Sequence, residues 1–137
     1  MPTLSGILET ALHVDDIARS SDFYESVLQL ERIAGDERFR AYSVAGRDVL
    51  LLFKRGTSDQ PFVFPGGVIP PHGSSGQIHV AFSVSAADLS AWESRLAAHS
   101  VPIESRVTWQ LGGRSIYFRD PDAHLLELAT PGLWSIY

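Results

Sequence analysis

The chain contains an internal repeat, and this feature limits its possible folds more than any other. Three segments of the first half have counterparts in the second half, in the same order. They are ALHV (11–14) with AFSV (81–84), YESVL (24–28) with WESRL (92–96), and DVLLLF (48–53) with HLLELA (124–129). Self-similarity of this kind indicates one supersecondary unit used more than once. We therefore expect two copies of one unit, separated by loops of unequal length.

Each copy is predicted to open with a strand that leads into a helix. Residues 7–14 and 77–84 are rich in Ile, Leu, Val and Phe, as strands are. Helix-start signals follow both strands: Asp15-Asp16 in the first copy, and Ser85 with Asp88 in the second. Apolar residues at helical spacing come next: Ile17, Tyr24, Val27 and Leu28, then Leu89, Trp92 and Leu96.

Three further strand-like segments complete each copy. They lie at 31–35, 38–45 and 47–54 in the first copy, and at 103–109, 114–118 and 124–130 in the second. The prediction is an α+β protein of two βαβββ modules, with module 1 at about 4–54 and module 2 at about 77–132. We expect both modules to form a single domain spanning residues 1–137.

The loop between the modules, residues 55–76, is rich in Pro and Gly but also contains apolar side chains. A flexible linker would not need Phe62, Phe64, Val68 and Ile69. Loops of this length in compact domains are usually functional or disordered. The aromatic content favours a loop that packs, and we expect it to lie over a cleft.

Composition excludes several classes of function. The net charge is -5 and Lys and Arg form no runs, so nucleic acid and anionic membrane surfaces are not expected partners. The chain has no cysteine, which excludes disulfides, thiolate metal sites and a cysteine nucleophile. The longest run of aliphatic or aromatic residues, Val49 to Phe53, is too short to span a bilayer. A cytoplasmic location is expected.

Three strands each carry one residue of a type that binds metals, on the face opposite most of their large apolar side chains. Side chains alternate between the two faces of a strand, and in each case the next residue on the polar face is alanine. The pairs are Glu9 with Ala11, His79 with Ala81, and Glu127 with Ala129. Small neighbours leave space beside each candidate ligand. His13 shares the face of Glu9, where it either supports the site or meets solvent.

A divalent cation would explain why two carboxylates and an imidazole occupy such positions. A buried carboxylate costs several kcal/mol unless it is paired, and two facing one cavity also repel each other. Three protein ligands leave coordination positions open, as catalytic sites require. The ligand set has oxygen and nitrogen but no sulfur, which leaves Mn²⁺, Fe²⁺, Ni²⁺, Co²⁺, Zn²⁺ and Mg²⁺ as alternatives. Taken singly, Glu9 is more often a solvated residue and His79 a hydrogen-bonded core residue.

Three stretches together resemble the vicinal oxygen chelate superfamily, which includes glyoxalase I, fosfomycin-resistance thiol transferases, extradiol dioxygenases, methylmalonyl-CoA epimerase and bleomycin-resistance proteins. The stretches are ETALHVDDIARSSDFYESVLQL, QIHVAFSV and GGRSIYFRDPDAHLLEL. The resemblance implies the glyoxalase/bleomycin resistance/dihydroxybiphenyl dioxygenase fold, in which two βαβββ modules form an open, cupped sheet around a metal. It also implies a homodimer, with modules paired either within a chain or between chains.

The resemblance assigns Glu9, His79 and Glu127 as the metal ligands. Leu51 stands where glyoxalase I has a fourth ligand, which argues against the four-ligand arrangement. Glu9 stands where family members often have His, which weakens the dioxygenase interpretation. Ala123 replaces the usual turn glycine and is expected to change only the local turn.

Two functions follow as alternatives. The first is a metal-dependent lyase, isomerase or thiol transferase that acts on an oxygenated small molecule, with Glu9 or Glu127 as the possible base. The second is a metal-free protein that binds a small molecule or antibiotic, like the bleomycin-resistance relatives. His72 is a further candidate acid or base if its loop covers the cleft. Candidate substrate-binding residues are Trp109, Arg114 and Tyr117.

Overall fold

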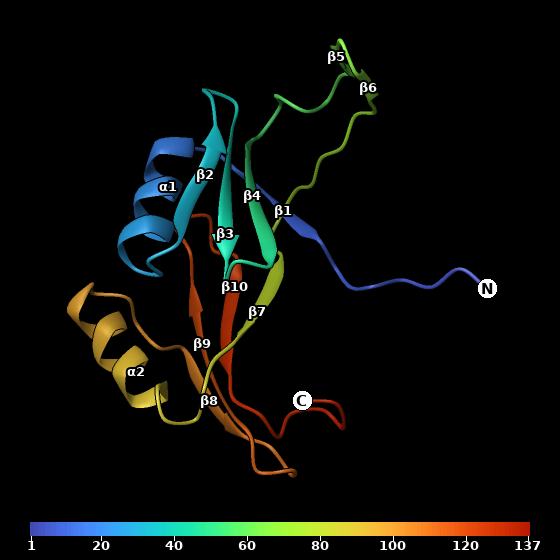
Figure 1. Cartoon of the computed structure of the whole chain (residues 1–137). Helices are drawn as coiled ribbons and strands as arrows, with labels where there is room; N and C mark the ends of the chain where they lie inside the picture. The colour runs from blue at the N-terminus through green and yellow to red at the C-terminus, as the bar shows by residue number, and fades with distance from the viewer. The chain divides into compact units, whose positions relative to one another are not determined.

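The computed structural model describes all 137 residues, which form two compact units, Met1–Ser75 and Gly76–Tyr137. Each unit contains one four-stranded sheet and one helix, and the strand order is the same in both (Figure 1). Unit 1 has the order β1-β4-β3-β2, and unit 2 has the order β7-β10-β9-β8. The predicted pair of βαβββ modules is therefore confirmed.

The elements follow the sequence prediction closely. Unit 1 contains β1 (Glu9–Val14), α1 (Ile17–Ser26), β2 (Glu31–Gly35), β3 (Phe39–Val44), β4 (Asp48–Lys54), β5 (Phe62–Phe64) and β6 (Gly67–Ile69). Unit 2 contains β7 (His79–Ser83), α2 (Leu89–Ala98), β8 (Ser105–Thr108), β9 (Arg114–Arg119) and β10 (Leu125–Ala129). The strand termini differ from the predicted ones by at most two residues.

In unit 1 the alternation of strand side chains produces one core face and one open face. On β1, Leu12 and Val14 are fully buried, and Leu50 and Leu52 of β4 are buried with them. This is the face that α1 covers (Figure 1). The strands β1 and β4 run parallel, with Ala11 opposite Leu51, so the odd-numbered residues of both strands point to the other face.

Unit 2 repeats this arrangement. The strands β7 and β10 run parallel, and β9 pairs antiparallel with β10. Leu126, Leu128 and Phe118 are buried in the core, as is Leu96 of α2. Glu127 therefore projects from the face opposite Leu126 and Leu128, as predicted.

The helix starts were predicted at the correct residues, and their capping differs. Asp16 caps α1, and its side chain accepts a hydrogen bond from the backbone N–H of Arg19 at 3.0 Å. Asp88 caps α2 without such a bond. Instead its backbone N–H donates to the hydroxyl of Ser85 at 3.1 Å. No helix in the structure is long and apolar enough to cross a membrane.

The segment predicted as a linker loop contains a short hairpin. Strands β5 and β6 pair antiparallel, with Phe62 opposite Ile69. The surrounding Pro and Gly residues hid this hairpin from the sequence prediction, because they indicate turns more strongly than three-residue strands indicate a sheet.

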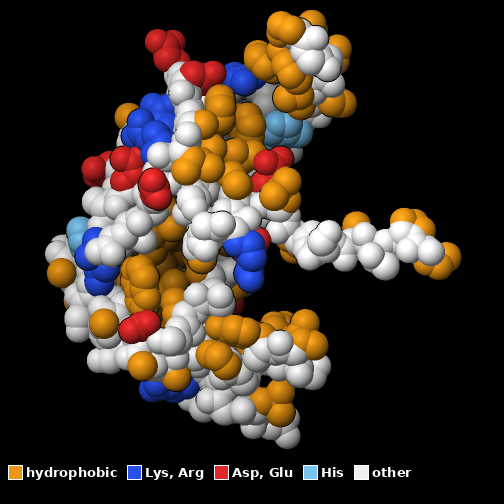
Figure 2. Space-filling view, viewed as in Figure 1, with side chains coloured by type: hydrophobic (Ala, Val, Ile, Leu, Met, Phe, Trp, Pro, Cys, Tyr) orange, Lys and Arg blue, Asp and Glu red, His pale blue; other side chains and the backbone are white.

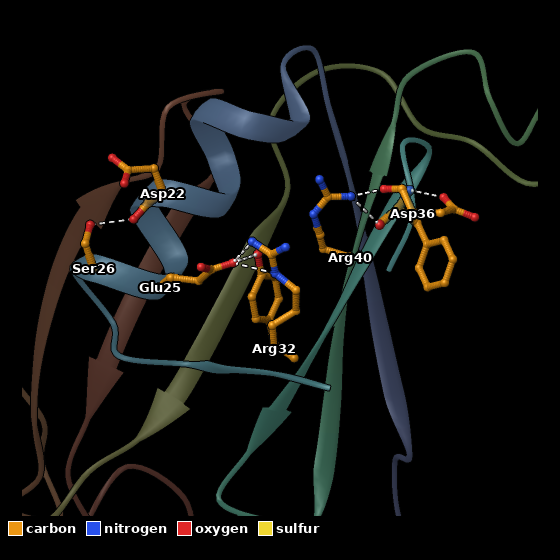
Figure 3. A network of polar contacts seen from close by, with 8 residues as sticks. Asp22, Glu25, Ser26, Arg32, Asp36 and Arg40 are labelled. Atoms are coloured by element: carbon orange, nitrogen blue, oxygen red, sulfur yellow. Dashed lines mark hydrogen bonds and ion pairs between the residues drawn. The ribbon is translucent and has the colours of Figure 1, made fainter. Parts of the chain in front are cut away.

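A polar cluster joins α1 to the sheet of unit 1 (Figure 3). Glu25 of α1 accepts a hydrogen bond from Nε of Arg32 at 2.8 Å and another from the hydroxyl of Tyr42 at 3.1 Å. Tyr42 is fully buried. Burial, followed by smaller effects that include the hydrogen bond to Glu25, raises the pKa of Tyr42. The neutral phenol is therefore the form that the fold stabilises.

Replacing this phenol should change both the stability and its dependence on pH. In Tyr42→Phe the free energy of unfolding at pH 7 should fall by about 1 kcal/mol, because one buried hydrogen bond is lost. Because the folded-state pKa of Tyr42 is raised, the stability that its neutral phenol contributes is fully present below the ordinary tyrosine pKa near 10. This contribution is lost as the pH rises through the folded-state pKa. Urea unfolding at pH 7 and pH 10.5 should show a smaller alkaline loss for Tyr42→Phe than for the wild type. An equal loss in both proteins would contradict this account.

Candidate metal centre

His79 and Glu127 lie next to each other on neighbouring strands of unit 2. His79 is opposite Leu125 in the parallel pairing of β7 and β10, and Glu127 is the next residue of β10 on the same face. Nε2 of His79 lies 3.2 Å from Oε2 of Glu127. The sequence prediction of a shared face is thus confirmed for these two residues.

The backbone fixes the tautomer of His79. Its Nδ1 lies 2.9 Å from the carbonyl oxygen of Leu125. A carbonyl only accepts hydrogen bonds, so Nδ1 carries the proton and donates. In the neutral ring, Nε2 then presents a lone pair toward the Glu127 carboxylate, and two acceptors 3.2 Å apart require a proton or a cation between them. Metal-bound histidines are typically oriented by such a hydrogen bond from the other ring nitrogen.

The second oxygen of the Glu127 carboxylate has no partner. Glu127 is only 4% exposed, and its Oε1 is buried without a hydrogen bond. Tyr117 is opposite Glu127 on β9, and burial, followed by its hydrogen bond to Glu127, raises the pKa of Tyr117. Buried carboxylate oxygens without partners are rare in folded proteins. An oriented imidazole beside an under-coordinated carboxylate is a donor set that fits a divalent cation.

The equivalent positions of unit 1 carry different residues. Glu9 is opposite Val49, as His79 is opposite Leu125, and Leu51 takes the place that Glu127 has in unit 2. Unit 1 therefore contributes one candidate ligand. Neither unit by itself brings three His, Asp or Glu side chains together. The complete set of Glu9, His79 and Glu127 stays a prediction.

Glu9 lies on the wall of a cavity of about 590 Å³ in unit 1. Ala11 and Leu51, on the same face of the sheet, also line this cavity. Its other lining residues come from the β2–β3 turn, β3, β4 and the segment 58–72: Asp36, Arg38, Phe39, Phe53, Ser58, Gln60, Phe62, Ile69, Pro70 and His72. The prediction that this segment packs over a cleft is consistent with these contacts.

His72 and His13 are in contact in unit 1. Nδ1 of His72 lies 3.2 Å from Nε2 of His13, and Nδ1 of His13 lies 2.9 Å from the hydroxyl oxygen of Ser74. His13 is only 5% exposed. Of its two predicted roles, contact with solvent is therefore wrong. His72 lines the cavity that Glu9 also lines.

The three predicted substrate-binding residues have different surroundings in unit 2. Tyr117 contacts Glu127 and lies beside His79, with 6.2 Å between the ring centroids. The indole N–H of Trp109 donates to the hydroxyl of Ser115 at 2.8 Å, which satisfies its polar edge. The Arg114 side chain is exposed.

Sequence reasoning missed Arg38 and Ser58, which line the unit 1 cavity. Arg38 follows the turn between β2 and β3, and Ser58 lies in the predicted loop. Both are common surface residue types, and neither has a distinctive spacing. The one available signal was the group of apolar residues in the loop.

Comparison with known proteins identifies the family. Residues 6–128 match the family model of the Glyoxalase/Bleomycin resistance protein/Dioxygenase superfamily. The chain belongs to this superfamily. Among its members, a crystal structure of lactoylglutathione lyase from Agrobacterium tumefaciens is similar, with a TM-score of 0.88 and 32% identity over 98% of this chain and 99% of that one.

Two curated superfamily members are also similar to this chain. Metallothiol transferase FosB from Shouchella clausii is 29% identical, over 93% of this chain and 81% of the relative. Fosfomycin resistance protein FosX from Listeria innocua is 27% identical, over 91% of this chain and 89% of the relative. The predicted family and fold class are therefore confirmed.

The buried carboxylate should destabilise the protein when no metal is bound. In chelator-treated protein, Glu127→Met should raise the free energy of unfolding by about 1 kcal/mol, because an apolar side chain of similar length replaces an incompletely paired charge. For a chain of this size that corresponds to a rise of about 4 °C in Tm. Leu51→Met, at the equivalent position of unit 1, is the control and should not raise Tm. A lower Tm for Glu127→Met would show that the metal-free carboxylate is already fully stabilised.

Proposed function

We propose that this protein is a glyoxalase-like metalloenzyme that uses a divalent cation as a Lewis acid on an oxygenated small molecule. The observation that carries the proposal is the pairing of His79, whose tautomer is fixed by Leu125, with the buried and under-coordinated carboxylate of Glu127. The names of similar proteins support it, since they include a metallothiol transferase and a lactoylglutathione lyase.

In this proposal His79 and Glu127 bind the cation, and Glu9 is its third ligand. Glu9 is exposed in unit 1, so its carboxylate is accessible to an ion. Two carboxylates and one imidazole suit Mn²⁺, Fe²⁺, Ni²⁺, Co²⁺, Zn²⁺ and Mg²⁺. We further propose that the protein works as a homodimer, with Glu9 supplied either by the same chain or by the second copy.

A bound cation would polarise the substrate oxygen and stabilise negative charge that develops on it. The chain would supply the proton transfers. Glu9 or Glu127 would accept a proton from the substrate or from an attacking thiol, because a carboxylate beside a reacting group can act as a base. Tyr117, kept neutral by its raised pKa, would donate a hydrogen bond to the bound molecule or to Glu127.

We propose thiol addition as the reaction class within this family of chemistries. The names of two relatives refer to a thiol or a glutathione group. This chain has no cysteine, so the thiol would come from a small-molecule co-substrate. The sulfur would form a bond to an electrophilic carbon while a carbon–oxygen bond of the substrate gives its electron pair to oxygen. The thiol proton would pass to the carboxylate base, and the oxygen would take up a proton.

The remaining predicted site residues are proposed in supporting roles. His72 is a second candidate acid or base, because it lines the same cavity as Glu9. Arg114 and Trp109 are proposed to contact the substrate from β9 and from the turn before it. The exposed guanidinium of Arg114 suits an anionic group.

A second candidate function is metal-free binding of a small molecule. The cavity of about 590 Å³ in unit 1 favours it, because apolar side chains such as Leu51, Phe53 and Phe62 line much of its wall. Cavities of this size and character bind drug-sized molecules. Metal content distinguishes the two functions.

The metal-binding prediction is tested by titrating chelator-treated protein with Mn²⁺ and Zn²⁺ and measuring bound ions per chain. Wild-type protein should bind about one ion per chain, and His79→Gln or Glu127→Gln should weaken binding at least about tenfold. His99→Gln, at the end of α2, is the control and should leave binding unchanged. Failure of the wild-type protein to bind either ion would favour the metal-free function.

A mixing experiment tests whether Glu9 comes from a second copy. Glu9→Gln and His79→Gln proteins should each bind metal weakly. If Glu9 acts across a dimer, each mixed dimer in a co-refolded mixture will have one intact site and one site that lacks both ligands. Since about half of random dimers are mixed, about a quarter of the wild-type metal capacity should return. Equilibrium dialysis measures this capacity. No recovery in mixed dimers isolated with two affinity tags would mean that each chain supplies its own Glu9.

A further inference from the structure

The cavity of unit 1 has a floor that changes character along the strands. At one end of the open face lie His13 of β1, Phe53 of β4 and Phe39 of β3, which are neighbours in the sheet register. Two residues further along β1 and β4 are Ala11 and Leu51. The rings of Phe39 and Phe53 are stacked, with centroids 5.8 Å apart. The floor is therefore aromatic at one end and aliphatic in the middle.

The hairpin β5–β6 supplies the roof of this cavity. Phe62 and Ile69 are opposite each other in the hairpin, and both line the cavity. Figure 2 shows that hydrophobic side chains gather on the open face of this sheet and over the hairpin. A flat apolar molecule could thus contact ring faces and aliphatic groups on both sides.

Polar contacts hold the segment that carries the roof. Ser58 is 5% exposed, and its hydroxyl donates to the carbonyl of His72 at 2.7 Å. The backbone N–H of His72 donates to the carbonyl of Ser58 at 2.9 Å. Arg55 donates to the carbonyl of Ser74 at 2.9 Å and pairs with Asp15 at 2.8 Å. These contacts tie the two ends of the segment to each other and to Arg55 and Asp15, the residues that follow β4 and β1.

Arg38 places a positive charge at the aromatic end. Its guanidinium lies over the ring of Phe62, 4.1 Å from the centroid, and 5.6 Å from the centroid of Phe39. No carboxylate pairs with it. The nearby Asp36 uses Oδ1 to accept the backbone N–H groups of Arg38 and Phe39, at 2.7 and 3.1 Å. A guanidinium that stacks on a ring still has N–H groups at its edge for a bound anion.

Glu9 lies toward the other end of the cavity. It is four residues from His13 on β1, a separation of ~13 Å along an extended strand. The cavity thus has a cation among aromatic rings at one end, an apolar middle, and the proposed metal ligand Glu9 at the other end. A molecule that matches this order has an anionic group, a flat apolar body and an oxygenated group.

We propose that the unit 1 cavity binds a planar aromatic molecule whose anionic group pairs with Arg38 and whose reactive oxygenated group points toward Glu9. The orientation toward Glu9 rests on the proposed metal-dependent function. The pairing with Arg38 does not depend on a metal. The substrate class is therefore an aromatic acid. Its electrophilic, oxygen-bearing carbon lies at the end of the molecule opposite the anionic group.

The proposal is tested in chelator-treated full-length protein with two probes of the same shape, 2-naphthoate and 2-naphthalenemethanol. Isothermal titration calorimetry gives the Kd of each probe for the wild type and for the Arg38→Gln and Phe62→Ala variants. Arg47→Gln removes an exposed arginine of unit 1, and Phe64→Ala removes a hairpin ring that does not line the cavity. These two variants are the controls, and circular dichroism confirms that all variants are folded.

The expected result is one saturable naphthoate site per chain. Arg38→Gln should raise the naphthoate Kd about tenfold and leave the alcohol unchanged, because only the carboxylate loses an ion pair. Phe62→Ala should weaken both probes, and the controls neither. Absence of saturable naphthoate binding, or equal effects of Arg38→Gln on both probes, would overturn the proposal.

The outcome is independent of the metal test. Arg38→Gln should retain wild-type Mn²⁺ affinity, because Arg38 contacts no proposed metal ligand. Metal binding without Arg38-dependent naphthoate binding would overturn the aromatic-acid proposal alone. Arg38-dependent naphthoate binding without metal binding would support the cavity and leave the protein with the metal-free function.

Discussion

The parallel pairing between the first and last strands of each module determines most of what this protein presents to a ligand. In unit 1 it sets Ala11 beside Leu51, and in unit 2 it sets Ala81 beside Glu127. One face of each sheet is then occupied by its helix, and the opposite face is free for chemistry. A shift of one residue in the unit 2 pairing would send Glu127 into the core and Leu128 out of it.

Equivalent positions of the two modules carry residues of different chemistry. In unit 2 the central position holds Glu127, a buried carboxylate with an unpartnered oxygen. In unit 1 the same position holds Leu51, which forms part of an apolar floor. The central position of the open face thus carries a donor group in one module and an apolar side chain in the other.

The sequence predicted the features that depend on local periodicity and missed those that depend on distant segments. Strand alternation and the repeat identified both sheets and placed His79 with Glu127, because both signals are local. They did not reveal that His13 is buried, since the residues that cover it, Ser58 and His72, are more than 40 positions away. Arg38 could not be recognised either, because its neighbour Phe62 belongs to a hairpin too short to have a periodic pattern.

The attachment of hairpin β5–β6 has a consequence for how this protein can diversify. The hairpin forms its own two-stranded sheet and does not extend either of the larger ones. Insertions, deletions or exchanges between Ser58 and His72 can therefore reshape the ligand chamber without disturbing strand registry or donor atoms. Evolution, or a directed library confined to those positions, has a route to new ligand selectivity that leaves the inherited reaction chemistry intact.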